Sequence, residues 1–156
     1  MASPQVNQAV VAPVFDIPVR VYWEDTDAGG IVFYANYLRF FERARTEWLR
    51  HLGLGQQALK DQHGGMFVVS QVDIRYLRPA RLDDRLRVTA QLTQAGRASL
   101  DLHQQAWLLP PEDAADTPSV LLSEANVRVG WVGADSLRPQ RIPAFVLGLL
   151  SARQPG

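Results

Sequence analysis

The chain has 156 residues and a formal net charge of zero, with 16 lysines and arginines against 16 aspartates and glutamates. Its length is typical of one domain that buries a core without covalent cross-links. The absence of cysteine excludes disulfides, thiolate nucleophiles and cysteine-ligated zinc. The balanced charge argues against a nucleic-acid partner.

Residues 1–13 contain no lysine or arginine, so they lack the basic start of a secretory signal. No apolar run approaches the length of a membrane span. We therefore expect a cytoplasmic protein with a loose N-terminal tail over 1–14, a single domain over 15–150 and a C-terminal tail over 151–156.

Alternating apolar residues predict a first strand from Phe15 to Trp23. A run of turn and cap formers follows at 24–30. Apolar residues then recur at helical spacing from Tyr34 to Leu52, and Gly53 is a typical helix stop. A short second helix is expected at 56–62.

Period-two alternation begins after residue 65 and predicts a strand with one face made of Val68, Ser70, Val72, Ile74 and Tyr76. Further strands are expected at 86–92, 100–108 and 125–131, and a short helix at 145–150. One long helix cannot supply the crossovers of a parallel sheet. The predicted fold class is therefore α+β, with one long helix against an antiparallel sheet of about five strands.

Several catalytic motifs are absent, namely the G-x-S-x-G elbow, the phosphate-binding loop and the dinucleotide fingerprint. His51, His63 and His103 have no metal-ligand spacing, so no metal site is expected. The stretch from Asp25 to Tyr37 is more informative, because an acidic residue, two glycines and a helix start follow one another.

Amides at a helix N-terminus can polarise a carbonyl and stabilise the oxyanion that forms when it is attacked. The carboxylate of Asp27 could act beside them as a general base on water or as a nucleophile. Gly29 and Gly30 would let a ligand approach the backbone closely. Such residues are, however, more often turn and cap formers than catalytic groups.

The run 21–37, VYWEDTDAGGIVFYANY, closely resembles the signature of the 4-hydroxybenzoyl-CoA thioesterase family, and more narrowly its YbgC-like branch associated with the Tol-Pal system. FERARTE at 41–47 and RPARLDD at 78–84 are similar to the same branch. The likeness extends from Pro18 to Pro143. It implies a hotdog fold, in which a curved antiparallel sheet wraps a long helix, and an acyl-CoA thioesterase that needs no cofactor beyond the coenzyme A of its substrate.

The resemblance also implies residue roles. Asp27 is the second acid of the D-x-D pattern and takes the catalytic position, while the backbone N–H of Tyr34 is the donor to the thioester carbonyl. Many members of the branch have histidine where this chain has Tyr34, which affects acyl preference rather than the backbone donor. Arg97 matches a basic position that touches CoA phosphate in some relatives. The expected substrate-binding residues are Gly29, Gly30, Ile31, Val32, Ser70 and Arg97.

The resemblance further implies a homodimer whose sheets join, with active sites at the interface, and commonly a homotetramer. Peripheral association with the inner membrane or with acyl carrier protein stays open. So do two other functions. A hydratase or dehydratase of the same fold would usually carry a histidine near the helix, and none lies near Asp27 in the sequence. The second alternative is a non-catalytic acyl-CoA or lipid-binding scaffold of the cell-envelope Tol-Pal system.

Overall fold

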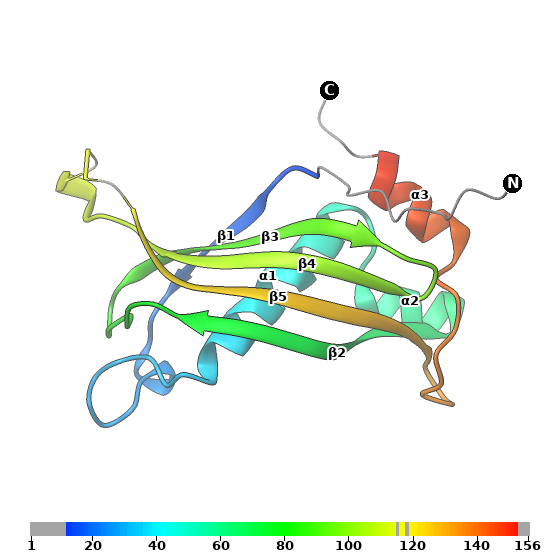
Figure 1. Ribbon diagram of the computed structural model, residues 1–156, viewed down its shortest axis with the longest axis horizontal. Coiled ribbons are helices and arrows are strands. Elements are labelled where there is room, and N and C mark those ends of the chain that lie inside the picture. Colours follow the sequence, from blue (N-terminus) through cyan, green and yellow to red (C-terminus); the bar gives the residue numbers. More distant parts are fainter. Residues whose placement is uncertain (1–11, 115, 118, 153–156) are drawn as a thin grey trace, which may run out of the picture.

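A five-stranded antiparallel sheet curves around one long helix (Figure 1). A computed structural model describes residues 12–114, 116–117 and 119–152, so most of the predicted tails lies outside the described residues. The α+β arrangement expected from the sequence is confirmed. The main elements are β1 (Phe15–Arg20), α1 (Asn36–His51), α2 (Gln56–His63), β2 (Gly65–Tyr76), β3 (Arg85–Ala95), β4 (Ser99–Leu108), β5 (Val120–Gly133) and α3 (Ala144–Ala152).

The strands lie in the order β1-β3-β4-β5-β2, and each pair of neighbours is antiparallel. Strands β3, β4 and β5 form a meander, whereas β2 lies at the edge opposite β1. The segment 77–84 therefore carries the chain from the β2 edge across to β3. It passes the start of α1, where the backbone N–H of Ala80 donates to the hydroxyl of Tyr37 over 3.1 Å. The same segment pairs with the loop that precedes α1, at Ile31 and Arg81.

Helix α1 begins at Asn36, so the prediction that Tyr34 belongs to it is wrong by two residues. The N–H of Asn36 bonds to the carbonyl of Phe33, which closes a turn before the helix. The apolar face expected from the helical spacing is buried, and Phe40, Phe41 and Ala44 are fully shielded from solvent. The buried face of this helix makes it the central element of the core.

Strand β2 contains a bulge that changes the predicted face. Its register against β5 shifts between Val69 and Gln71, leaving Ser70 without a partner residue. An extra residue in one strand moves every preceding side chain to the other face. The prediction that Val68 and Ser70 share a face with the later residues is therefore wrong. Opposite the buried positions of β5 lie Phe67, Val69, Val72, Ile74 and Tyr76.

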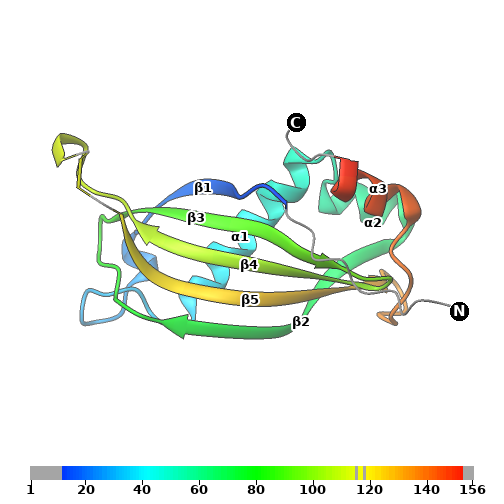
Figure 2. The ribbon, with the colours of Figure 1, turned by 45° about the horizontal axis from the view of Figure 1, so that its top comes forward.

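The helix covers only part of the concave face of the sheet. It crosses that face obliquely, packing mainly on β1, β3 and β4, while α2 and α3 gather at the far end (Figure 2). Because α1 leaves β2 largely uncovered, Val69, Val72 and Tyr76 stay 47%, 37% and 44% exposed. The structure thus presents an apolar strip along a long edge strand.

Candidate active site

Asp27 lies at the tip of a small hairpin between β1 and α1. Its N–H donates to the carbonyl of Ile31 over 2.9 Å, and its carbonyl accepts the N–H of Gly30 over 3.0 Å. Gly30 has φ 78°, a left-handed conformation that closes such three-residue loops and favours glycine. Thr26 and Val32 pair beyond the tip. The glycine run therefore forms the turn that its composition predicts.

The carboxylate of Asp27 is held in one orientation. Its Oδ1 accepts the N–H of Gly29 over 2.8 Å, as in many turns that begin with aspartate. A Cβ at Gly29 would lie 3.1 Å from the same oxygen, so the glycine permits a close approach. Asp27 is exposed, and within the described ranges its Oδ2 accepts no hydrogen bond. One oxygen is thus anchored while the other faces solvent.

The crossing segment 77–84 holds this hairpin in place. Ile31 pairs with Arg81, and the N–H of Val32 donates to the carbonyl of Ala80 over 2.9 Å. Below the hairpin, Val21 and the Asp83–Asp84 pair exchange two backbone hydrogen bonds of 3.0 and 2.9 Å. The run at 78–84 therefore has a structural role, because its backbone hydrogen bonds hold the hairpin that carries Asp27 in position.

A buried polar pair joins the hairpin to the helix. Asp25 is 4% exposed and Asn36 is 7% exposed, and the side-chain amide of Asn36 donates to Oδ1 of Asp25 over 2.8 Å. Oδ2 of Asp25 accepts the N–H of Tyr22, also over 2.8 Å. Sequence reasoning did not assign Asn36 a role in the site. Its place near the end of the helix-start motif was the only signal for one. Because both side chains are buried and hydrogen-bonded to each other, the pair holds the loop in position against the helix.

Tyr34 follows the hairpin directly and lies in the turn before α1, 64% exposed. The N–H groups on either side of this turn are engaged, since Phe33 donates to Asp25 and Asn36 donates to Phe33. Among the described residues, the N–H of Tyr34 has no acceptor. The donor role that the family resemblance implies for this N–H stays a prediction. The ring of Tyr34 contacts Tyr76 at the end of β2, with centroids 6.0 Å apart.

The other predicted site residues are divided among three places. Gly29, Gly30 and Ile31 lie with Asp27 in the hairpin, as does Val32, whose side chain is buried in the core. The remaining two lie elsewhere. Ser70 occupies the β2 bulge, where its hydroxyl donates to the carbonyl of Arg128 over 3.3 Å. Arg97 is exposed in the β3–β4 turn.

That turn lies at the opposite end of the sheet from the Asp27 hairpin (Figure 1). Strand β3 alone has 11 residues, which corresponds to about 35 Å at the usual rise. The structure therefore does not bring Arg97 to Asp27 within one copy of the chain.

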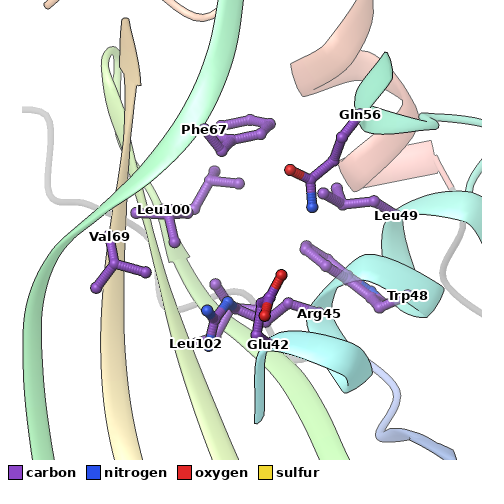
Figure 3. Close-up of a pocket in the computed structure, with 10 residues that line it drawn as sticks. Glu42, Arg45, Trp48, Leu49, Gln56, Phe67, Val69, Leu100 and Leu102 are labelled. Carbon is purple, nitrogen blue, oxygen red and sulfur yellow. The ribbon is translucent and has the colours of Figure 1, made fainter. Parts of the chain in front are cut away.

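A cavity of about 220 Å³ lies between the second half of α1 and the concave face of the sheet (Figure 3). Trp48 and Leu49 of α1 face Val69 and Leu100 of the sheet across it, and Phe67 closes one end. Sequence reasoning did not find this cavity, because its walls come from segments far apart in the chain. It lies toward the end of α1 that is remote from Asp27.

Two absences hold for the residues that the structure describes. No group of three or more histidine, cysteine, aspartate or glutamate side chains in them is placed to hold a metal ion. No helix in the same ranges has both the length and the apolar character to cross a membrane.

Comparisons with known proteins show the family to which the chain belongs. The model of the thioesterase superfamily matches residues 29–115. The acyl-CoA thioester hydrolase YbgC of Escherichia coli O6:H1 is 40% identical over 134 residues, which cover 86% of this chain and 93% of that protein.

Two solved structures resemble the chain along most of its length. A probable thioesterase from Bartonella henselae is 30% identical with a TM-score of 0.71, and the match covers 84% of this chain and 100% of that chain. The 4-hydroxybenzoyl-CoA thioesterase of Pseudomonas sp. strain CBS-3 shares the fold at 21% identity and a TM-score of 0.79, over 88% of this chain and 99% of that chain. The chain therefore belongs to the thioesterase superfamily, within the group of YbgC acyl-CoA thioesterases.

Proposed function

We propose that this protein hydrolyses acyl-CoA thioesters to the free acid and coenzyme A, with Asp27 as the catalytic carboxylate. The observation that carries the proposal is the carboxylate at the hairpin tip, with Oδ1 anchored by Gly29 and Oδ2 open to solvent. The name of the 40% identical relative, an acyl-CoA thioester hydrolase, supports the substrate class. No metal or redox cofactor is needed for this reaction.

In the first of two mechanisms, Asp27 acts as a general base. It takes a proton from water while the water oxygen bonds to the thioester carbon, and the carbonyl electrons move onto its oxygen. The N–H of Tyr34 then stabilises the oxyanion. When the intermediate collapses, the C–S bond breaks and the coenzyme A thiolate takes up the proton held by Asp27.

In the second mechanism, Asp27 is the nucleophile. Its carboxylate oxygen bonds to the thioester carbon and expels the thiolate, forming a mixed anhydride that water then hydrolyses. The anchored Oδ1 leaves Oδ2 as the attacking atom. Both mechanisms use the same residues. In both, the N–H of Tyr34 stabilises the negative charge that develops on the carbonyl oxygen.

The proposal includes a homodimer formed by antiparallel pairing of β2 with its copy. A strand of 12 residues at a sheet edge leaves a row of unpaired backbone groups, which natural proteins cover or pair. The exposed Val69, Val72 and Tyr76 would be buried by the same contact. Association of two such dimers into a tetramer is a further part of the proposal.

Antiparallel pairing has a consequence for the site. A two-fold axis near the middle of β2 places the Gly65 end of one copy beside the Tyr76 end of the other. Because Tyr34 contacts Tyr76, the Asp27 hairpin then lies near the second copy's cavity and its β3–β4 turn. Arg97 can reach the phosphates of a bound coenzyme A only from that second copy. The proposed active site is thus shared between two chains.

The test is the Asp27→Asn variant, assayed by release of coenzyme A with a thiol-reactive dye. The chain has no cysteine, so the dye reports only the product. Asparagine keeps the acceptor for the Gly29 N–H, and the fold should survive. We expect kcat to fall by at least about 10²-fold, as for loss of a general acid-base group.

The matched control is Asp135→Asn, an exposed carboxylate in the turn after β5, which should keep full activity. If Asp27→Asn retains activity, the catalytic assignment is wrong. If the unmodified protein binds acyl-CoA of every chain length without releasing coenzyme A, the protein is a binding scaffold and the enzyme proposal fails.

A cytoplasmic location is part of the proposal, since coenzyme A thioesters are made and used there.

A further inference from the structure

A second, smaller cavity of about 110 Å³ also has Trp48 in its wall. Its walls come from the start of the described chain, the end of α1, β3 and α3, and include Phe15, Leu52, Leu92 and Leu150. Within the described residues, Trp48 is the one side chain that lines both cavities. The indole is 7% exposed and belongs to the walls of both cavities, and we call it the partition.

The larger cavity is suited to an apolar occupant. Most of its wall is aliphatic or aromatic (Figure 3). Two of its polar residues already have protein partners: Arg45 donates to Gln104 over 2.9 Å, and Gln56 donates to Thr46 over 3.0 Å. The third, Glu42, is exposed and lies beside Arg45 at one end. Most lining residues are therefore apolar, while Glu42 and Arg45 form a polar part of the wall at one end (Figure 3).

We propose that the larger cavity receives the unbranched acyl chain of the substrate and that the indole of Trp48 sets the longest chain accepted. This inference rests on the proposed thioesterase function and names the part of the substrate that the cavity selects. In the proposed dimer, the cavity of one copy lies beside the Asp27 hairpin of the other. The acyl chain enters past Glu42 and runs toward Trp48.

The physical basis is the close packing of the partition. A chain that reaches the indole can extend only by displacing a buried aromatic ring, and overpacking a filled interior is unfavourable. Removing the indole joins the two cavities and gives the chain the apolar space lined by Leu52, Leu92 and Leu150. One methylene in an apolar pocket changes kcat/KM by roughly 10–200-fold. The length limit should therefore be sharp and should move when Trp48 is shortened.

The experiment compares the unmodified protein with Trp48→Ala and Trp48→Leu on saturated acyl-CoAs from butanoyl to stearoyl. We expect kcat/KM for the first rejected chain, relative to the last accepted one, to rise by about tenfold or more in the variants. Trp48→Leu keeps an apolar side chain and serves if the alanine variant does not fold. The inference is overturned if a folded, active Trp48 variant keeps the original length limit.

Leu52→Ala is the matched control, because Leu52 directly follows the last residue of α1 and lines only the smaller cavity. It also enlarges the interior but leaves the partition in place, so its length limit should stay unchanged. If Leu52→Ala shifts the limit as far as Trp48→Ala does, general loosening of the core explains the result and Trp48 is no partition.

A binding measurement separates this inference from the proposed activity. In an Asp27→Asn background, calorimetry gives the Kd of each acyl-CoA with and without Trp48→Ala, and hydrolysis plays no part. A shift of the tightest-bound chain to greater length supports the role of Trp48 even if the unmodified protein shows no turnover. Turnover with an unmoved binding preference supports the thioesterase and overturns the role of Trp48.

Discussion

The carboxylate of Asp25 accepts a hydrogen bond from the side-chain amide of Asn36, with 2.8 Å between Oδ1 and Nδ2. Both residues are buried, and they join the Asp27 hairpin to the first residue of α1. The positions of Asp27 and of the Tyr34 amide relative to the helix depend on this contact. It stabilises a site whose own carboxylate is exposed.

The first prediction concerns this pair. Asp25→Ala leaves the Asn36 amide and the Tyr22 N–H without their acceptor, and the free energy of unfolding should fall by about 1.5–3 kcal/mol. Asn36→Ala should also destabilise the fold, and the double variant should lose less than the sum of the two, with a coupling of about 0.5–3 kcal/mol. Urea unfolding at one protein concentration measures the free energy of unfolding of the unmodified protein, the two single variants and the double variant. Strict additivity would show that the contact has no energetic role.

The second prediction concerns the backbone at Gly30. Alanine there has free space around its Cβ, so strain at φ 78° is the main effect. A left-handed conformation costs an L-residue about 1–2 kcal/mol, and relief of that strain would reshape the hairpin that carries Asp27. We expect Gly30→Ala to lose both stability and kcat/KM.

Gly53→Ala is the control for Gly30→Ala, since Gly53 has φ 82° and an equally open surrounding at the far end of α1. Thermal unfolding should report similar destabilisation for both variants. The thioesterase assay should report a loss only for Gly30→Ala. Equal losses of activity would mean that general instability, and not the hairpin, limits the reaction.

The third prediction tests the β2 interface. Val72 is 37% exposed on the uncovered concave strip, so Val72→Asp should leave the protomer folded but place a charge in the dimer contact. Light scattering after gel filtration should show a monomer, and activity should be lost because the proposed site is shared between two chains. Leu137→Asp, at a 62% exposed apolar residue in a turn, should remain a dimer. A Val72→Asp protein that stays dimeric would place the interface elsewhere.

The fourth prediction concerns pH. Burial raises the pKa of the Tyr37 phenol, an effect partly opposed by the hydrogen bond from the Ala80 N–H. Above about pH 10 the unfolded chain loses this proton while the folded chain keeps it. The unfolded state then binds fewer protons, so stability should fall as pH rises through that value. Tyr37→Phe should flatten this fall, as measured by urea unfolding across the alkaline range.

Tyr37→Phe should also lower stability at neutral pH by about 1–3 kcal/mol, because the Ala80 N–H loses its acceptor. Tyr76→Phe is a useful comparison. Burial raises the pKa of Tyr76 too, but its side chain is far more exposed. Its effect on the alkaline slope should be smaller. An unchanged slope in Tyr37→Phe would mean that other groups govern alkaline unfolding.

Local patterns in the sequence were sufficient for the element types and for the turn that carries Asp27. Helical spacing from Tyr34 to Leu52 and alternation in the strands depend only on near neighbours along the chain. The structure has a helix at Asn36–His51 and five strands, although the predicted face of β2 is wrong before its bulge. The hairpin at Asp27 was predictable for the same reason, since aspartate and glycine determine such a turn through contacts within five residues.

Features that depend on distant contacts were decided by the tertiary structure alone. The start of α1 at Asn36 depends on Asp25, and the face of β2 changes at the Ser70 bulge, which appears only in its pairing with β5. The β3–β4 turn lies at the end of the sheet opposite the hairpin, which leaves Arg97 remote from Asp27 within one chain (Figure 1). The cavity and its Trp48 partition arise where the helix, the sheet and the end segments meet, because packing brings together side chains that no local pattern relates.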